Sequence, residues 1–273
     1  MSNLTEYRDG SLSFRHVRDE APNPAVFKLH NHASYEVYYF ISGKGSFYVE
    51  GSEYPLHSGD LLIMRSTEAH YISVDPSAPY ERLTLHFCRE LVHDVDGSGE
   101  LLKAFEKREA GRQNLFTERD FRSGFYAALL EHLKDSADSN PRLQAVTVLY
   151  ALLNEIRLAY ENAGTPGVSE QESLAYNIIS YVNGHLEEQL SLDDICARFF
   201  VSKAQLCRTF KKTTGTTVWG YVTTKRLSAA RGMILSGVPA TQAHERCGFH
   251  DYSAFYRAYR KQFGRSPTEE RAR

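Results

Sequence analysis

Two stretches near the carboxyl end of the chain repeat one short pattern, and this repeat constrains the fold more than any other feature. The first runs from Ser202 to Gly215 and the second from His250 to Gly264. Each has a small or polar first residue, then an apolar, a basic and an aromatic residue, a basic cluster and a closing glycine. This spacing predicts a short helix packed on another helix and ended by the glycine. The last third of the chain is therefore expected to be all-helical, with two copies of one unit.

The first copy carries the signals that begin helices. Ser191 precedes Asp193 and Asp194, whose carboxylates suit the positive amino end of a helix. Ser202, followed three residues later by Gln205, predicts the start of the next helix. Apolar residues at helical spacing would form a core shared by the two helices: Ile195, Phe199, Leu206 and Phe210. The residues left outward form a basic face suited to phosphates and base edges: Lys203, Ala204, Cys207, Arg208, Lys211 and Lys212.

This part of the chain resembles the DNA-binding domain of the AraC/XylS family of bacterial transcription regulators. The matching elements are residues 206–212 with Gly215, residues 225–235, residues 247–249, and residues 257–264 followed by Ser266 and Pro267. The resemblance implies two helix-turn-helix units, joined by a long helix over residues 216–235. Such a helix would span about 30 Å, close to the ~34 Å between successive major-groove faces of DNA.

The resemblance also implies which side chains contact DNA. In the first unit, base contacts would come from Ala204, Cys207 and Arg208, with Lys203, Lys211 and Lys212 near phosphates. In the second unit, they would come from Tyr252, Ser253 and Arg257, flanked by His250, Arg260 and Lys261. The alternative for either arginine is an ordinary solvated helix face. The second unit departs from the family at Ala243 and His244, where a large aliphatic residue and an alanine are usual, so we expect a looser or tilted reading helix there.

Charge is divided unevenly along the chain. Residues 169–273 hold 15 Lys and Arg against 10 Asp and Glu, although the whole chain of 273 residues has a net charge of -2. This asymmetry is typical of a basic duplex-binding module attached to an acidic sensing domain. We expect a cytoplasmic protein without a membrane span, because no apolar run is long enough. The four cysteines lack paired metal-ligand spacing and are expected to be reduced thiols.

The amino-terminal part has the period of strands. Residues 36–41 and 46–50 flank a glycine-containing turn, and further strand-like runs follow at 52–56, 60–64, 71–74 and 82–87. Short strands at this spacing predict an antiparallel sandwich or barrel. The predicted fold class is therefore α+β and multidomain: an antiparallel β cupin-like barrel over 1–92, helices over 93–163, a linker over 164–170, and an all-α double helix-turn-helix domain over 171–273.

Within the barrel, residues 30–43 resemble the first cupin motif, and Gly59-Asp60 with His70 resembles the second. His30, His32 and Glu36 are even-numbered, so one extended strand would turn all three to one face, where with His70 they could hold a divalent metal. The second motif is imperfect at Arg65 and Thr67, and the Arg65 guanidinium would favour an anionic effector. An organic effector pocket and ordinary structural histidines remain the alternatives. The candidate effector residues are His30, His32, Glu36, Tyr38, Phe40, Tyr48, Arg65 and His70.

The period changes to about 3.6 after the barrel, which predicts helices over 100–108, 118–134 and 142–160. By the family resemblance, helices within 98–162 would form a homodimer, whereas the alternative is that their apolar stripe packs on the chain's own barrel. The stripe of the last helix consists of Leu143, Val146, Leu149, Leu153, Ile156 and Tyr160.

The predicted function is a DNA-binding transcription regulator that responds to a small molecule, with a sugar favoured, and not an enzyme. It is expected to be an activator, with RNA polymerase as a partner and no obligatory cofactor. Two alternatives remain: a metal-dependent cupin enzyme that uses His30, His32, Glu36 and His70, and a regulator whose barrel only mediates assembly.

Overall fold

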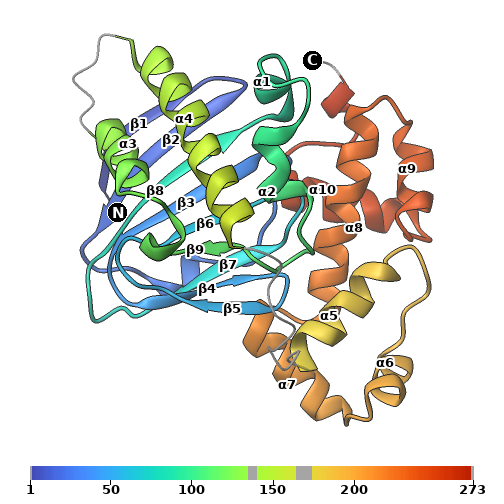
Figure 1. The fold of residues 1–273 in the computed structure, drawn as a ribbon. Coiled ribbons are helices and arrows are strands. Elements are labelled where there is room, and N and C mark those ends of the chain that lie inside the picture. Colours follow the sequence, from blue (N-terminus) through green and yellow to red (C-terminus); the bar gives the residue numbers. More distant parts are fainter. Residues whose placement is uncertain (1, 135–139, 164–173, 272–273) are drawn as a thin grey trace.

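The structure is a computed structural model that describes residues 2–134, 140–163 and 174–271 (Figure 1). The predicted linker over 164–170 lies outside the described residues. The strands are β1 (Ser2–Arg8), β2 (Leu12–Asp19), β3 (Tyr35–Ser42), β4 (Gly45–Val49), β5 (Ser52–Pro55), β6 (Leu61–Met64), β7 (His70–Val74), β8 (Tyr80–Phe87) and β9 (Leu115–Phe116). The helices of the same half are α1 (Arg89–His93), α2 (Lys103–Glu106), α3 (Phe125–Lys134) and α4 (Pro141–Asn162), with short 3-10 turns at Pro24–Val26, Glu100–Leu102 and Glu118–Asp120.

The strands form two antiparallel sheets rather than one closed barrel. The larger sheet has the order β1-β2-β8-β3-β6-β9 and the smaller has the order β5-β4-β7. A buried apolar cluster from both sheets, including Tyr38, Phe47 and Ile72, lies between them. The expected α+β class is confirmed, and the cupin-like barrel takes the form of two facing sheets.

Successive side chains of β3 and β8 point alternately to the two faces of the larger sheet, which have different surroundings. In β8, Leu83, Leu85 and Phe87 belong to the core under the helices, whereas the alternate residues face the other side, because successive side chains of a strand point to opposite faces. The register pairs Glu36 of β3 directly with His86 of β8. Polar side chains from both strands are thereby brought together on the inner face of the larger sheet.

Helices α3 and α4 cover the outer face of the larger sheet (Figure 1). Leu149, Leu153 and Ile156 of α4 are fully buried in the core that they share with β2, β3 and β8, whereas Leu143 is 59% exposed. The centre of the predicted stripe therefore packs on the chain's own sheet. The predicted helices over 100–108 and 118–134 each begin as a 3-10 turn, and their α-helical parts, α2 and α3, are shorter than expected.

The carboxyl-terminal half is all-helical, as predicted. It consists of α5 (Leu174–Gly184), α6 (Leu192–Phe199), α7 (Lys203–Thr214), α8 (Val218–Leu235), α9 (Ala240–Arg246), α10 (Tyr252–Phe263) and a 3-10 turn at Glu269–Arg271. Helices α6 and α7 pack with α5 and the first part of α8 in one apolar cluster. Helices α9 and α10 pack with the second part of α8 in another. Among the described helices, none combines the length and apolarity needed to cross a membrane.

The first helical cluster continues into the β domain. Ala69, which precedes β7, is a buried member of the cluster, and Leu29 packs against it. The Tyr71 hydroxyl of β7 donates to the Lys212 carbonyl of α7 at 2.9 Å. The two halves of the chain therefore share a packed interface, with α5, α7 and α8 lying nearest to the smaller sheet (Figure 1).

Candidate functional site

Helix α7 exposes its predicted basic face. The Ser202 hydroxyl caps the helix by accepting from the Gln205 amide at 3.2 Å. The helix ends at Gly215, whose φ of 67° is the left-handed conformation that glycine adopts without strain. The six predicted contact residues of this unit are all exposed: Lys203, Ala204, Cys207, Arg208, Lys211 and Lys212.

Helix α10 is built in the same way. Asp251 caps it by accepting from the Ser253 and Ala254 amides at 3.1 and 2.8 Å, and Gly264 ends it with a φ of 72°. Tyr252, one of the predicted contact residues of this unit, is half-buried. The other five are exposed, namely His250, Ser253, Arg257, Arg260 and Lys261. Two capped helices with outward cations are therefore carried at the two ends of α8.

The unusual support of the second unit is a buried histidine. Ala243 and His244 of α9 are both buried, and the His244 ring lies 5.2 Å from the Tyr252 ring and 5.8 Å from the Phe255 ring. Within the described residues, Nδ1 of His244 has no hydrogen-bond partner. The aromatic neighbours let the imidazole pack where an alanine is usual in the family, at the cost of an unsatisfied polar atom.

The β domain encloses a cavity of about 490 Å³ between its sheets. Five of the eight predicted effector residues line it: His30, His32, Glu36, Tyr38 and His70. Phe40, Tyr48 and Arg65 are not among the described residues that line it. The Tyr48 ring instead stacks on the Tyr71 ring, with 4.7 Å between the ring centroids. Arg65 lies beside Glu68, and its guanidinium donates to the Arg108 carbonyl at 3.3 Å.

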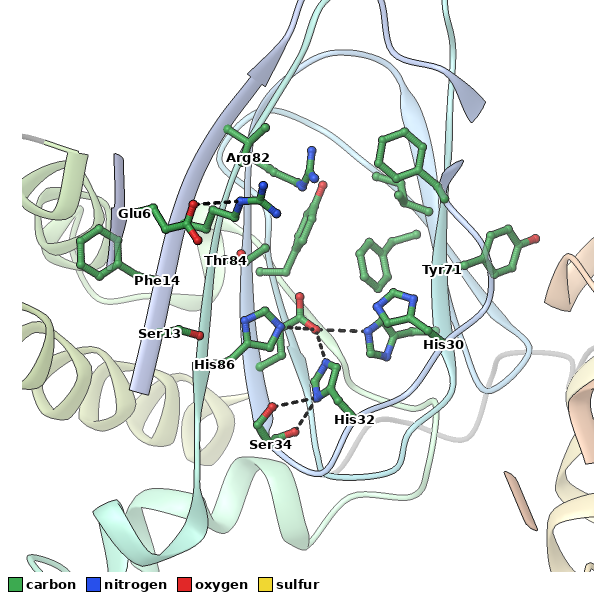
Figure 2. Close-up of a pocket in the computed structure, with 18 of the residues that line it drawn as sticks. Glu6, Ser13, Phe14, His30, His32, Ser34, Tyr71, Arg82, Thr84 and His86 are labelled. Atoms are coloured by element: carbon green, nitrogen blue, oxygen red, sulfur yellow. Dashed lines mark hydrogen bonds and ion pairs between the residues drawn. The ribbon is translucent and has the colours of Figure 1, made fainter. Parts of the chain in front are cut away.

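The histidines converge on one carboxylate at the cavity wall. Oε2 of Glu36 lies 2.9 Å from Nε2 of His32, 3.1 Å from Nε2 of His70 and 3.5 Å from Nε2 of His86 (Figure 2). His30 completes the cluster, with its ring 4.4 Å from that of His70. The expected single strand is not present, because His30 forms an isolated bridge with His70 and only Glu36 lies on β3. Tertiary pairing nevertheless brings all four predicted residues together.

The charge of the Glu36 carboxylate is set by its neighbours. Burial alone would raise the pKa of Glu36, but the imidazoles of His86, His32 and His70 outweigh it and hold that pKa well below its usual range. Next to it, burial raises the pKa of Tyr80 to about 12, and its hydroxyl lies 2.7 Å from that of Tyr38. The cavity therefore combines one buried anion with hydroxyl groups that remain neutral at physiological pH.

His86 and Arg82 are among the cavity residues that sequence reasoning missed. Both lie on β8, and the sequence signal that could have found them is the alternation Arg82, Thr84, His86 along that strand. Arg82 packs its guanidinium over the Tyr80 ring at 4.7 Å and the Phe27 ring at 5.5 Å. Its Nη1 atom is buried without a hydrogen-bond partner among the described residues. Arg82 therefore supplies the cavity cation that was expected from Arg65.

Two family descriptions match the chain. The description "AraC-like ligand binding domain" matches residues 11–179, more than half of the chain, and "Helix-turn-helix domain" matches residues 195–273. The first match contains the histidine cluster of the cavity and the second contains α7 and α10.

Individual relatives agree with these matches. The chain is 29% identical to the probable transcriptional regulator LumQ of Photobacterium leiognathi over 51% of this chain and 55% of the relative, so it spans about half the length of that protein. It is 24% identical to the HTH-type transcriptional activator RhaR of Enterobacter sp. over 94% of this chain and 91% of the relative. A solved structure of a transcriptional regulator with an AraC-type DNA-binding domain, from Chromobacterium violaceum, is 36% identical with a TM-score of 0.33, covering 35% of this chain and 86% of that chain.

Proposed function

The chain belongs to the AraC family of transcriptional regulators, and on this premise we propose that it binds double-stranded DNA through α7 and α10 and responds to a small molecule in the β-domain cavity. The observation that carries the proposal is the pairing of two capped, outward-facing basic helices on one connecting helix. At about 1.5 Å per residue, α8 is long enough to hold them near successive major-groove faces.

Both units contact DNA through their exposed basic side chains in this proposal. Arg208 and Arg257 are exposed on the outer faces of α7 and α10, where a guanidinium can contact guanine with two hydrogen bonds. Lys211, Lys212 and Lys261 lie near the helix ends and would neutralise phosphates.

The cavity is the effector site in this proposal. Its hydroxyls, imidazoles and the Arg82 guanidinium suit a small polar molecule, and a sugar is the class we favour. The unpartnered Nη1 of Arg82 is a donor that such a ligand would satisfy.

A direct path connects the cavity to the DNA-binding helices. Ser228 of α8 donates to Oδ1 of Asn31, the residue between His30 and His32. Lys225 of α8 donates to the Thr67 carbonyl at 2.9 Å, three residues before His70. Because the segments that carry the cavity histidines contact α8 itself, a ligand that moves them would move the helix that holds both reading units.

Activation, dimerisation and location are further parts of the proposal. The name of RhaR supports an activator, for which RNA polymerase would be a partner. A homodimer through helices within 98–162 is supported by the exposed Leu143 and Phe125, which are 59% and 50% exposed. The cytoplasm fits the four free thiols found in the described part of the chain.

The test is DNA binding by the full chain. Genomic fragments bound by the purified protein would be footprinted, and affinity for the selected duplex measured between 50 and 200 mM salt, roughly the range over which phosphate contacts dominate. Lys212→Ala should weaken binding to all duplexes and lower the salt slope by about one. Lys44→Ala, at an exposed lysine of the β domain, is the matched control and should change neither. Absence of footprints would overturn the proposal.

An enzyme built on the cavity is the second candidate, and a barrel that only mediates assembly is the third. The enzyme would be supported by turnover of a small molecule without duplex affinity. Thermal-shift measurements with sugars, organic acids and metals test the third candidate. A ligand that binds in the cavity raises the Tm of the chain, whereas a barrel that only mediates assembly should give no shift with any of them.

A further inference from the structure

The larger sheet presents polar side chains to the cavity in a fixed order along β8. Arg82, Thr84 and His86 are alternate residues of this strand and line the cavity together (Figure 2). At about 3.3 Å per residue, the Cα atoms of Arg82 and His86 lie about 13 Å apart. The register pairs His86 with Glu36 of β3 and Thr84 with Tyr38. This wall of the cavity therefore has a carboxylate among imidazoles at one end, a guanidinium at the other, and hydroxyl groups between them.

The guanidinium of Arg82 has no anionic partner within the described part of the chain. Arg82 is half-buried, its Nη1 atom is buried without a hydrogen-bond partner, and it makes no ion pair with any described residue. Arg15, which lines the same cavity, differs in that its Nε lies 3.8 Å from a carboxylate oxygen of Glu6. A guanidinium stays charged at physiological pH, and withdrawing a charge from water is costly unless an anion pairs with it. The Arg82 charge therefore marks a place for an anion from outside the chain.

The shape and surroundings of the guanidinium select among anions. Its N–H groups form a planar fork that matches the two oxygens of a carboxylate. Its face already packs over the rings of Tyr80 and Phe27, at 4.7 and 5.5 Å, so the N–H edge is the part left for a ligand. The anionic Glu36 lines the same cavity and disfavours a doubly charged group such as a phosphate. A single carboxylate is therefore the anion that fits.

The rest of the cavity suits a ring with hydroxyl groups. The ion pairs of Glu36 with described residues all use Oε2, which leaves Oε1 to accept from a bound hydroxyl. The hydroxyls of Tyr38 and Tyr80 lie 2.7 Å apart and offer further partners. On the opposite side, the smaller sheet contributes the apolar side chains of Phe47 and Ile72. A sugar ring combines hydroxyls at its edge with an apolar C–H face that can pack on such side chains.

We propose that the effector is a sugar acid, whose carboxylate pairs with Arg82 and whose hydroxyls reach the Glu36 end of the cavity. The cavity volume of about 490 Å³ is within the range of small-molecule sites. This inference rests on the proposed function, because the cavity is taken there as the effector site, and it narrows the favoured class from sugars to their acids. It also gives Arg82 a role in specificity, since the neutral sugar leaves the guanidinium unpaired.

The experiment compares acids with matched neutral sugars by calorimetric titration and thermal shift of the full chain. The pairs are D-galacturonate with D-galactose and D-glucuronate with D-glucose, in which the neutral sugar carries a hydroxymethyl group in place of the carboxylate. At least one acid should raise the Tm, and its neutral partner should bind about 10–100-fold more weakly, because a charged hydrogen-bonded pair is lost. Arg82→Met should abolish this difference. Arg119→Met, at an exposed position outside the cavity, is the matched control and should retain it.

A second measurement separates ligand binding from a structural role of Arg82. Without ligand, Arg82→Met should not lower the Tm, because the apolar part of the side chain is kept and no ion pair is lost. A lowered Tm together with unchanged acid binding would show that the guanidinium supports the fold, and would overturn the proposal.

Other probes test the two chemical parts of the effector. Hexanoate has a carboxylate without hydroxyls, and glucose-6-phosphate has hydroxyls with a phosphate. Tighter binding of either probe than of the two acids would overturn the sugar acid, as would the absence of a thermal shift with both acids. A chain that leaves footprints on DNA but binds neither acid would overturn only this inference. One that binds an acid through Arg82 but leaves no footprints would overturn only the DNA-binding part of the proposed function.

Discussion

The two helix-turn-helix units have matching caps, glycine ends and exposed basic faces, but they differ in what supports them. The core of the first unit includes Ala69 from the β domain, whereas the core of the second is formed by α8, α9 and α10. The first unit is thus packed directly against the sensing domain, whereas the described core of the second unit is built on α8. Under the proposed function, a change in the cavity would therefore reach α7 through direct packing and α8, and α10 through α8 alone.

The buried carboxylate of Glu50 is a further contact between the β domain and the helices around the first unit. Its Oε1 accepts from the Ala69 amide and from Lys225, both at 2.6 Å, and its Oε2 accepts from Asn183 at 2.7 Å and from the Tyr221 hydroxyl. Three of these four donors belong to α5 and α8, so one β-domain side chain holds the helical domain.

The largest expected effect is therefore that of Glu50→Ala. Removing the carboxylate leaves the Lys225 ammonium without its ion-pair partner in a largely buried interface, which should lower the free energy of unfolding by about 3–5 kcal/mol. Urea unfolding of the full chain measures this loss. Hydrogen exchange should rise more in α7 than in α10. Glu53→Ala, at an exposed position, is the control and should change the free energy of unfolding little. An equal rise of hydrogen exchange in α7 and α10 would contradict the proposed difference in support between the two units.

The second unit is tied to the first by Arg226. Its guanidinium donates to the carbonyls of Leu186 and Glu188, each at 2.7 Å, and to that of Gly248 at 2.8 Å. Arg226→Ala should cost about 1–3 kcal/mol, because it leaves these carbonyls unsatisfied. Exchange should rise in α9 and α10, and the exposed Arg246→Ala serves as control. If α7 alone loosened, the proposed path to the second unit would be wrong.

The two reading arginines test whether support affects recognition. Arg208→Ala should relax preference at one base position and cost about 1–3 kcal/mol. Arg257→Ala should weaken binding more evenly across sequences, since its helix rests on the His244 support. Competition binding against a randomised half-site pool measures both. A base preference lost equally in the two variants would show that the units read DNA alike.

The smallest expected effect concerns His244. Replacing its imidazole by an aliphatic side chain removes an unsatisfied buried nitrogen, so His244→Leu should raise the free energy of unfolding by about 1 kcal/mol. Urea unfolding measures this gain, and His250→Leu at an exposed position is the control. Destabilisation by His244→Leu would mean that the imidazole packs better against Tyr252 and Phe255 than an aliphatic chain does.

The sequence by itself determined the features that depend on near neighbours. Ser191 and Ser202 cap helices because their hydroxyls accept from amides three residues later. Gly215 and Gly264 end helices because each directly follows the last helical residue and adopts the left-handed conformation that glycine tolerates without strain. These local rules predicted two helices of the same design in an all-helical carboxyl-terminal half, and the resemblance of its motifs to the AraC/XylS family implied the double helix-turn-helix and the family. The single extended strand predicted for His30, His32 and Glu36 was wrong, because only Glu36 lies on β3.

Only the tertiary structure decided which distant residues meet. His86 joins the cluster because β8 pairs with β3 in a register that sets it opposite Glu36. Arg82 rather than Arg65 reaches the cavity, since Arg65 lies next to Glu68. Glu50 contacts three donors of the helical domain. Such contacts depend on strand register and domain packing, which bring together residues far apart in the chain, so no local spacing could have specified them.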